Sequence, residues 1–104
     1  VITFTTQPSN RLGISTTSAT TFAIVASADP TASLTYQWQY ASSVGAAYTN
    51  LSNGGIYSNV TTATVGIGST TITATRPNGF YYRAVVTSTG GATATSDAAT
   101  LTYA

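Results

Sequence analysis

The chain has 104 residues, of which 5% are charged: three Lys or Arg and two Asp or Glu give a formal net charge of +1 at pH 7. So few scattered cations cannot neutralise a run of phosphates or hold the chain on an anionic lipid surface, and no apolar run reaches the roughly 18 residues of a membrane span, which predicts no nucleic-acid partner and no membrane insertion. Without Cys, neither a disulfide nor a thiolate metal site can form, and the length suits one domain over residues 1–104.

Apolar and polar side chains alternate with a period of two, and turn residues interrupt this alternation at regular intervals. No 3.6-residue pattern persists, so the sequence predicts an all-β fold. Turns are expected at Asp29-Pro30, at Asn53-Gly54-Gly55 and at Gly90-Gly91. In chain order, the predicted strands cover residues 2–6, a short irregular continuation over 11–17, then 20–28, 34–40, 48–51, 62–67, 80–88 and a last strand that ends at Leu101 and Tyr103.

Two of these strands carry the clearest pattern. Residues 36–40 read Tyr-Gln-Trp-Gln-Tyr, and residues 79–86 read Gly-Phe-Tyr-Tyr-Arg-Ala-Val-Val. Because successive side chains on a strand point to opposite faces, each strand presents one apolar face, and two such faces predict the core of a sandwich. The residues expected in this core are Phe22, Ile24, Ala26, Tyr36, Trp38, Val65, Ile67, Tyr82, Ala84, Val86 and Leu101.

Nearly the whole chain resembles the immunoglobulin-like domains of bacteria and phages. The resemblance rests on Phe22-x-Ile24-x-Ala26, Tyr36-Gln37-Trp38-Gln39, Asn78-Gly79-x-x-Tyr82-x-Ala84-x-Val86 and Ala99-x-Leu101. It implies a β-sandwich of two antiparallel sheets with about seven to eight strands and Greek-key connections.

The same resemblance assigns structural roles to individual residues. It places Trp38 over the position of an inter-sheet disulfide, where Ala26 and Ala84 stand in place of the two cysteines, as in the cysteine-less branch of the family. It also implies that the Tyr82 hydroxyl caps a backbone group just before Gly79.

The residues available for catalysis are few. The chain contains no His, Glu or Lys, the side chains that usually transfer protons near neutral pH. Asp29 is expected in a turn and Asp97 well inside the last strand, so the two carboxylates do not form a pair, and each stands alone as a calcium ligand. The sequence predicts no enzyme, no catalytic residue, no metal site and no cofactor; a small glycan-processing enzyme is the disfavoured alternative.

The candidate binding surface is the outward face of the sheet that contains the two patterned strands. Alternation places Gln37, Gln39, Tyr81, Arg83 and Val85 on that face. This set could stack on a sugar and bond its hydroxyls, or form a subunit contact. The alternative is a ladder that faces water, in which Tyr81 covers the stem of Arg83. A second contact surface is expected where the loops 29–33 and 88–92 lie at one end of the sandwich.

The absence of Lys leaves strand edges without their usual protection, which suggests that neighbouring subunits or domains cover them. The Thr-Thr-Gln-Pro opening and the Thr-Gly-Gly-Ala-Thr hairpin resemble modules of phage capsid or tail proteins. That resemblance implies a module or mature subunit on a virion surface, acting in subunit packing and weak adhesion to cell-surface glycans. The alternative is a repeat or filament subunit of a secreted or cell-surface bacterial adhesin that assembles through its strand edges.

Overall fold

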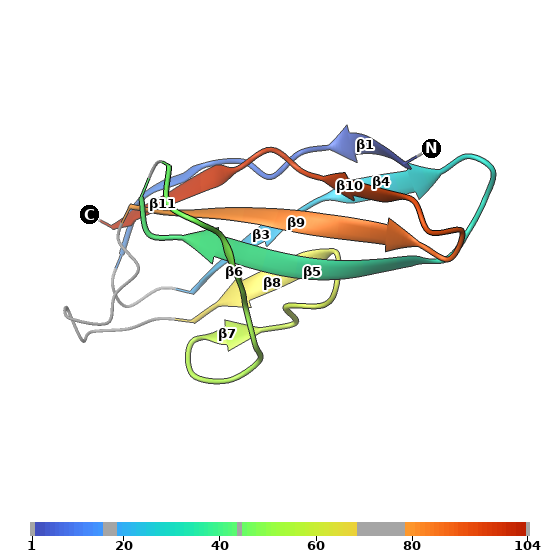
Figure 1. The fold of residues 1–104 in the computed structure, drawn as a ribbon. Coiled ribbons are helices and arrows are strands. Elements are labelled where there is room, and N and C mark those ends of the chain that lie inside the picture. Colours follow the sequence, from blue (N-terminus) through green and yellow to red (C-terminus); the bar gives the residue numbers. More distant parts are fainter. Residues whose placement is uncertain (1, 16–18, 44, 69–78, 104) are drawn as a thin grey trace.

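The structure, a computed structural model, describes residues 2–15, 19–43, 45–68 and 79–103. The regular elements in these ranges are all β-strands, which confirms the predicted class (Figure 1). They include no helix that is long and apolar enough to cross a membrane. In chain order the strands are β1 (Ile2–Thr6), β2 (Arg11–Ile14), β3 (Thr20–Ala23), β4 (Val25–Ala28), β5 (Leu34–Ala41), β6 (Thr49–Asn50), β7 (Tyr57–Ser58), β8 (Thr64–Ile67), β9 (Phe80–Ser88), β10 (Thr93–Thr95) and β11 (Ala99–Tyr103).

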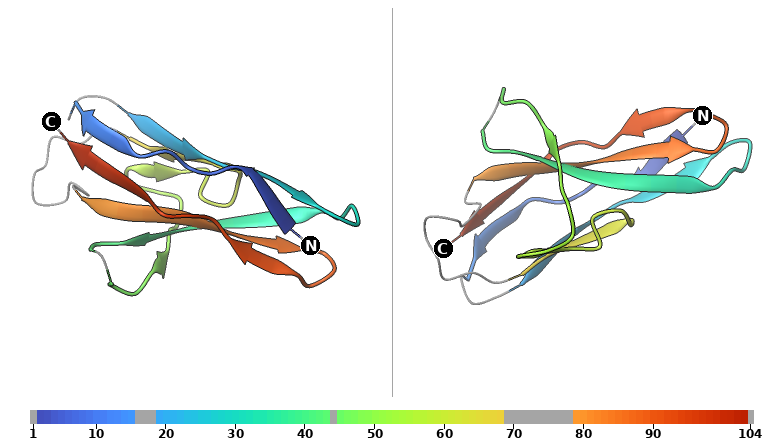
Figure 2. Two further views of the ribbon diagram at one scale, coloured as in Figure 1. Left: turned by 90° about the horizontal axis from the view of Figure 1, so that it is seen from above. Right: turned by 60° about the horizontal axis from the view of Figure 1, so that its bottom comes forward.

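These strands form two layers that pack face to face (Figures 1 and 2). One layer holds β1 beside β4, and β3 beside β8 and β7; the other has the order β2-β11-β9-β5-β6, with β10 also paired to β9. From β1 to β11 the chain passes from one layer to the other five times. Strand β9 pairs with β5 although β6, β7 and β8 come between them in sequence, as in a Greek key. The N- and C-terminal ends lie at opposite ends of the long axis (Figure 1).

The described residues hold more and shorter strands than the sequence predicted, because two expected strands are interrupted. The expected strand 20–28 breaks at Ile24, so β3 pairs with β8 while β4 pairs with β1. The last strand breaks between β10 and β11, and Asp97 lies in that break rather than inside a strand, which corrects the prediction. The two-residue strand β7 was not predicted.

One pairing is parallel, in contrast to the purely antiparallel sheets that were expected. Strand β2 runs parallel to β11, with Arg11 opposite Leu101 and a register shift before the next pair. Gly13 in β2 has a φ of 66°, a left-handed conformation that suits glycine. The expected continuation of β2 to residue 17, and the predicted connection through Arg76 and Pro77, lie partly or wholly outside the described residues.

The core lies between the layers, around Trp38. Trp38 has no exposed surface and lies opposite Ala84 of the neighbouring strand β9. It donates its indole N–H to the Thr62 carbonyl at 2.8 Å. A small alanine opposite an indole leaves room for the ring, and the hydrogen bond satisfies its one polar group. Of the residues expected in the core, nine are buried, namely Phe22, Ile24, Trp38, Val65, Ile67, Tyr82, Ala84, Val86 and Leu101, whereas Ala26 and Tyr36 are partly buried and pack against that cluster.

Tyr82 joins the two layers through its ring and its hydroxyl. Its ring stacks on Phe22 of the other layer with centroids 5.2 Å apart, and its hydroxyl lies 2.8 Å from the hydroxyl of Tyr57. The backbone group just before Gly79 that was expected to accept from this hydroxyl lies outside the described residues. Tyr57 is therefore a polar partner of Tyr82 that the sequence did not indicate.

Candidate functional site

The register of β5 and β9 places the predicted binding residues on one face. Gln37 is opposite Val85 and Gln39 is opposite Arg83, while Tyr81 is opposite Ala41 one step further along. All five predicted side chains are partly buried and alternate with the buried residues of the same two strands. They therefore line the outer surface of the larger layer, on the side away from Trp38.

Arg83 is the charged centre of this face, and its guanidinium is held from two directions. Its Nε donates to Gln39 Oε1 at 2.9 Å, and its Cζ lies 3.7 Å from the centroid of the Tyr48 ring. Gln39 is fixed in turn, because its Nε2 donates to Asn50 Oδ1 at 2.8 Å. A guanidinium over an aromatic face gains a cation–π attraction, and the chain of side-chain hydrogen bonds limits its rotamers.

The terminal amino groups of Arg83 remain available in this arrangement. Arg83 donates its Nε–H to Gln39, and among the described residues no hydrogen-bond acceptor is found for its two terminal NH₂ groups. Gln37 is less available, since its Nε2 donates to the carbonyls of Leu51 and Trp38 at 2.9 and 2.8 Å. The face can thus offer a fixed pair of donors to a planar acceptor, beside the partly exposed ring of Tyr81.

Tyr48 was not predicted to be the aromatic partner of Arg83. The ring at the guanidinium is that of Tyr48, which comes directly before β6. The alternative in which Tyr81 covers the stem of Arg83 stays a prediction. A signal was present, because Tyr48 and Asn50 alternate with Thr49 and so share one face of the predicted strand 48–51. The antiparallel pairing of Asn50 with Gln39 then brings the Asn50 side chain to Gln39 and the Tyr48 ring to Arg83.

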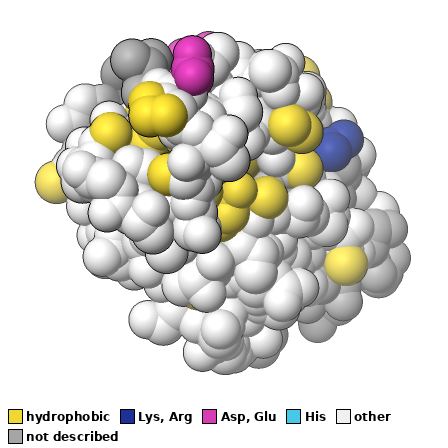
Figure 3. Space-filling model, turned by 90° about the vertical axis from the view of Figure 1, so that its right-hand side faces the viewer, with side chains coloured by type: hydrophobic (Ala, Val, Ile, Leu, Met, Phe, Trp, Pro, Cys, Tyr) yellow, Lys and Arg dark blue, Asp and Glu magenta, His cyan; other side chains and the backbone are white. Residues whose placement is uncertain are grey.

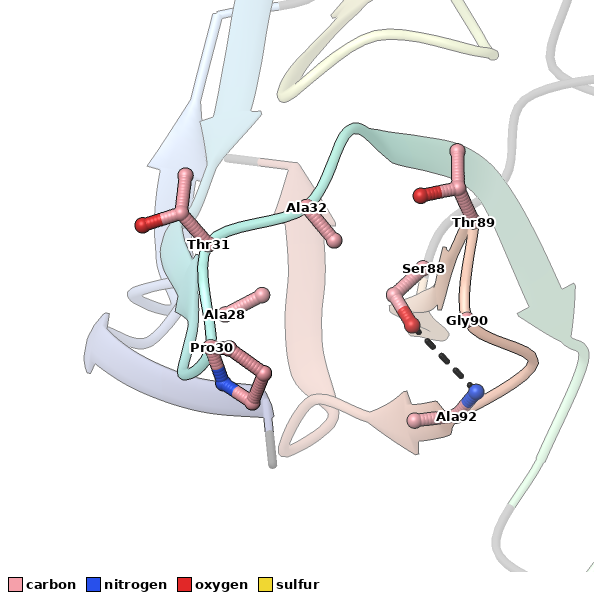
Figure 4. Close-up of a pocket in the computed structure, with 8 residues that line it drawn as sticks. All are labelled: Ala28, Pro30, Thr31, Ala32, Ser88, Thr89, Gly90 and Ala92. Carbon is pink, nitrogen blue, oxygen red and sulfur yellow. Dashed lines mark hydrogen bonds between the residues drawn. The ribbon is translucent and has the colours of Figure 1, made fainter.

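The two loops predicted at one end of the sandwich do meet, and they line an open hollow of about 440 Å³ (Figure 4). The loops are tied together by the Thr89 N–H, which donates to the Ser33 carbonyl at 3.0 Å. Within the β9–β10 turn, Ser88 Oγ accepts from the Ala92 N–H at 3.3 Å. The lining residues are small and uncharged: Ala28, Pro30, Thr31, Ala32, Ser88, Thr89, Gly90 and Ala92.

This end of the molecule carries both hydrophobic and charged side chains. Figure 3 views it directly and shows several hydrophobic side chains near the centre of the face, with acidic and basic side chains only toward the rim. A hollow lined by small side chains offers shallow contact and few fixed donors, in contrast to the ordered group around Arg83. The outward face is therefore the better defined of the two candidate surfaces.

The two acidic residues of the chain lie in different connections. Asp29 lies in the connection between β4 and β5, and Asp97 lies between β10 and β11. The described part of the chain contains no group of three or more Asp, Glu, His or Cys side chains that could hold a metal ion.

Comparison with known proteins relates the chain to solved structures alone. No family model and no curated protein matches the sequence. In the N-terminal four Ig domains of Dscam1 isoform 4.44, the match has a TM-score of 0.72 at 14% identity and covers 99% of this chain and 25% of that one. In the Ig1-2 module of the Drosophila receptor protein tyrosine phosphatase DLAR, the TM-score is 0.64 at 19% identity, over 99% of this chain and 48% of that one.

The chain has the immunoglobulin fold. The immunoglobulin layers correspond to the two layers described above, with β5, β9 and β11 as the strands of the larger sheet and Trp38 as the core tryptophan. The chain spans a quarter to about half of the length of these solved structures. The immunoglobulin fold hosts many unrelated activities, so function has to be argued from the surface.

Proposed function

We propose that residues 1–104 form a non-enzymatic immunoglobulin-like module that makes weak adhesive contacts through the outward face of its larger sheet. The observation that carries this proposal is the fixed guanidinium of Arg83, which is bonded to Gln39, stacked on Tyr48 and left with two free terminal amino groups among the described residues. A group that is already ordered loses little entropy when it binds, so its hydrogen bonds contribute more of their energy to affinity.

Saccharides are the ligand class that this face suits. Tyr81 offers a partly exposed ring for the apolar face of a sugar, and Gln39, Asn50 and Arg83 offer amide and guanidinium groups for its hydroxyls. The predicted face contains one charged residue, Arg83, and consists of side chains on the surface of a sheet, which favours shallow and repeated contacts over tight capture. Adhesion would then depend on many copies of the module acting together.

The absence of His, Glu, Lys and Cys from the sequence supports a role in contact rather than in turnover. The proposed setting is a virion surface, where the module packs against neighbouring subunits and meets cell-surface glycans. A repeat or filament subunit of a bacterial secreted or cell-surface adhesin is the second candidate, and the absence of Lys from the strand edges supports it. Flanking sequence separates the two, because capsid or tail proteins differ from serial repeats behind a secretion signal.

A glycan array tests the adhesive role. The module, displayed in several copies on a streptavidin carrier, is expected to bind a subset of saccharides and not to bind all of them uniformly. Arg83→Gln should weaken this binding about tenfold or more, since a hot-spot arginine commonly contributes over about 1.4 kcal/mol. Arg11→Gln removes the same charge from a side chain whose Nε is bonded to the Thr21 carbonyl, away from the face, and should leave the binding unchanged.

Thermal melting of both variants checks that each is folded. Equal loss of binding in Arg83→Gln and Arg11→Gln would indicate non-specific attraction by net charge. A uniformly flat array would contradict the adhesive role and leave the module as a purely architectural part.

A further inference from the structure

One stretch of sheet edge remains open although its strand is long and regular. Trp38 donates its backbone N–H to the Val60 carbonyl and accepts from the Leu51 N–H, both at 2.9 Å, on the side of β5 that faces away from β9. Because backbone groups alternate in direction along a strand, Tyr36 and Leu34 direct their N–H and C=O groups to that same side. Strand β6 pairs only with Gln39 and Tyr40, and among the described residues nothing is paired with Leu34 or Tyr36 on this side.

Several of the other edges carry features that discourage pairing, whereas this one does not. Strands β6 and β7 are two residues long, β1 contains a register shift, and β2 contains a left-handed glycine. Short strands, bulges and charged side chains are the usual protection of an edge. Residues 34–36 belong to an eight-residue strand, contain no charged side chain and pair without a shift to β9. In Figure 1 this segment is the start of β5, before the chain that leads to β6 crosses it.

We propose that residues 34–36 form a docking edge at which a second copy of this chain adds its own residues 34–36 in antiparallel register. A two-fold axis at Thr35 places Leu34 of each copy opposite Tyr36 of the other, and both are hydrogen-bonded pairs that exchange N–H···O bonds in each direction. Every backbone group that the edge leaves open in this segment then has a partner. This inference does not depend on adhesion through the Arg83 face.

A second copy fits this edge better than an unrelated strand does. The match is self-complementary, and the side chains of Leu34 and Tyr36, now partly buried, gain apolar contacts across the axis. The chain before Leu34 leaves the sheet into the connection from β4, so the pairing ends there and does not extend. A contact of this size is weak and requires a high local concentration, as exists in an assembly of many copies.

A single cysteine tests the register directly, since the natural chain contains none. The two copies of Thr35 form a non-hydrogen-bonded pair, with Cα atoms about 4.5 Å apart, which lies within the range of about 4.4–6.8 Å for a disulfide. Under mild oxidation, Thr35→Cys is expected to form a covalent dimer at least about tenfold faster than Thr93→Cys. Thr93 is the matched control, because it is also exposed and faces the same way in the same row, two strands further across the sheet.

Sedimentation of cysteine-free variants provides the second measurement. The unmodified chain should show concentration-dependent dimerisation, and Thr35→Lys should weaken it about fivefold or more because two like charges then face each other. Thr93→Lys adds the same charge away from the axis and should leave it unchanged. Equal crosslinking of the two cysteine variants, or a monomer at every concentration, would overturn the proposal; so would dimerisation that Thr35→Lys leaves intact.

Discussion

Replacing Ser96 by Ala is expected to destabilise the fold although the change removes one oxygen atom. Ser96 lies in the break between β10 and β11 and is only 6% exposed. Its backbone N–H donates to the Ala84 carbonyl at 2.8 Å, as in an ordinary antiparallel pair. Its side-chain Oγ accepts from the Ala84 N–H at 2.8 Å, in the place that a backbone carbonyl takes in an unbroken ladder.

The magnitude follows from what Ser96→Ala leaves behind. Ala84 has no exposed surface, so its N–H cannot turn to water when the Ser96 hydroxyl is gone. An unsatisfied buried donor costs about 1–3 kcal/mol, and the bond from Ser96 Oγ to the Asp97 carbonyl at 3.0 Å is lost as well. We therefore expect a loss of about 2 kcal/mol in the free energy of unfolding, which corresponds to about 10 °C in Tm for a chain of this size.

Urea unfolding followed by Trp38 fluorescence measures this change, since Trp38 is the one tryptophan and is buried beside Ala84. Ser9→Ala is the matched control, because Ser9 is exposed in the connection between β1 and β2, and its free energy of unfolding should change by less than about 0.5 kcal/mol. If Ser96→Ala were as stable as Ser9→Ala, the Ser96 hydroxyl would not be completing the ladder.

Three further substitutions probe the core and its surroundings. Trp38→Phe should cost about 2–3 kcal/mol, measured by circular dichroism during urea unfolding, because it leaves a void and orphans the Thr62 carbonyl; a change below about 0.5 kcal/mol would contradict the packing. Tyr57→Phe should cost about 1 kcal/mol in the same assay, since it removes a hydroxyl bonded to the buried Tyr82, and a stabilised variant would refute that bond. Leu12→Ala should change Tm by no more than a few degrees, because Leu12 is 64% exposed; a large loss would show that this side chain is buried in solution.

The parts of the fold that the sequence predicts well are those where one strong pattern acts alone. Alternation in β5 and β9 fixes which side chains share a face, and the structure pairs Trp38 with Ala84 and Gln39 with Arg83 accordingly. The interruption of the last strand was not predictable in this way. Alternation is weak in this strand, because Thr95-Ser96-Asp97 are all polar, and the pattern does not show what replaces the ladder there. The fit of the Ser96 side chain against Ala84 shows it, since Ser96 Oγ takes the place of a backbone acceptor.

The candidate site was predicted in part for a related reason. Alternation assigns Arg83 and Gln39 to the outward face, but it does not say in which direction a long side chain leans. Arg83 leans across β5 toward the β6 side, where Tyr48 supplies the ring, and this choice depends on the antiparallel pairing of Gln39 with Asn50. The parallel pairing of β2 was likewise hidden, because it depends on how the chain crosses between layers and not on the composition of residues 11–14.

We propose above that the chain makes adhesive contacts through the outward face around Arg83. Titration of the isotopically labelled module with the saccharide that binds best on the array, followed by backbone amide NMR, tests it most directly. We expect the shifts to cluster at Gln39, Tyr81 and Arg83 on β5 and β9. Shifts that cluster instead at the connections 28–32 and 88–92 around the end hollow would contradict it.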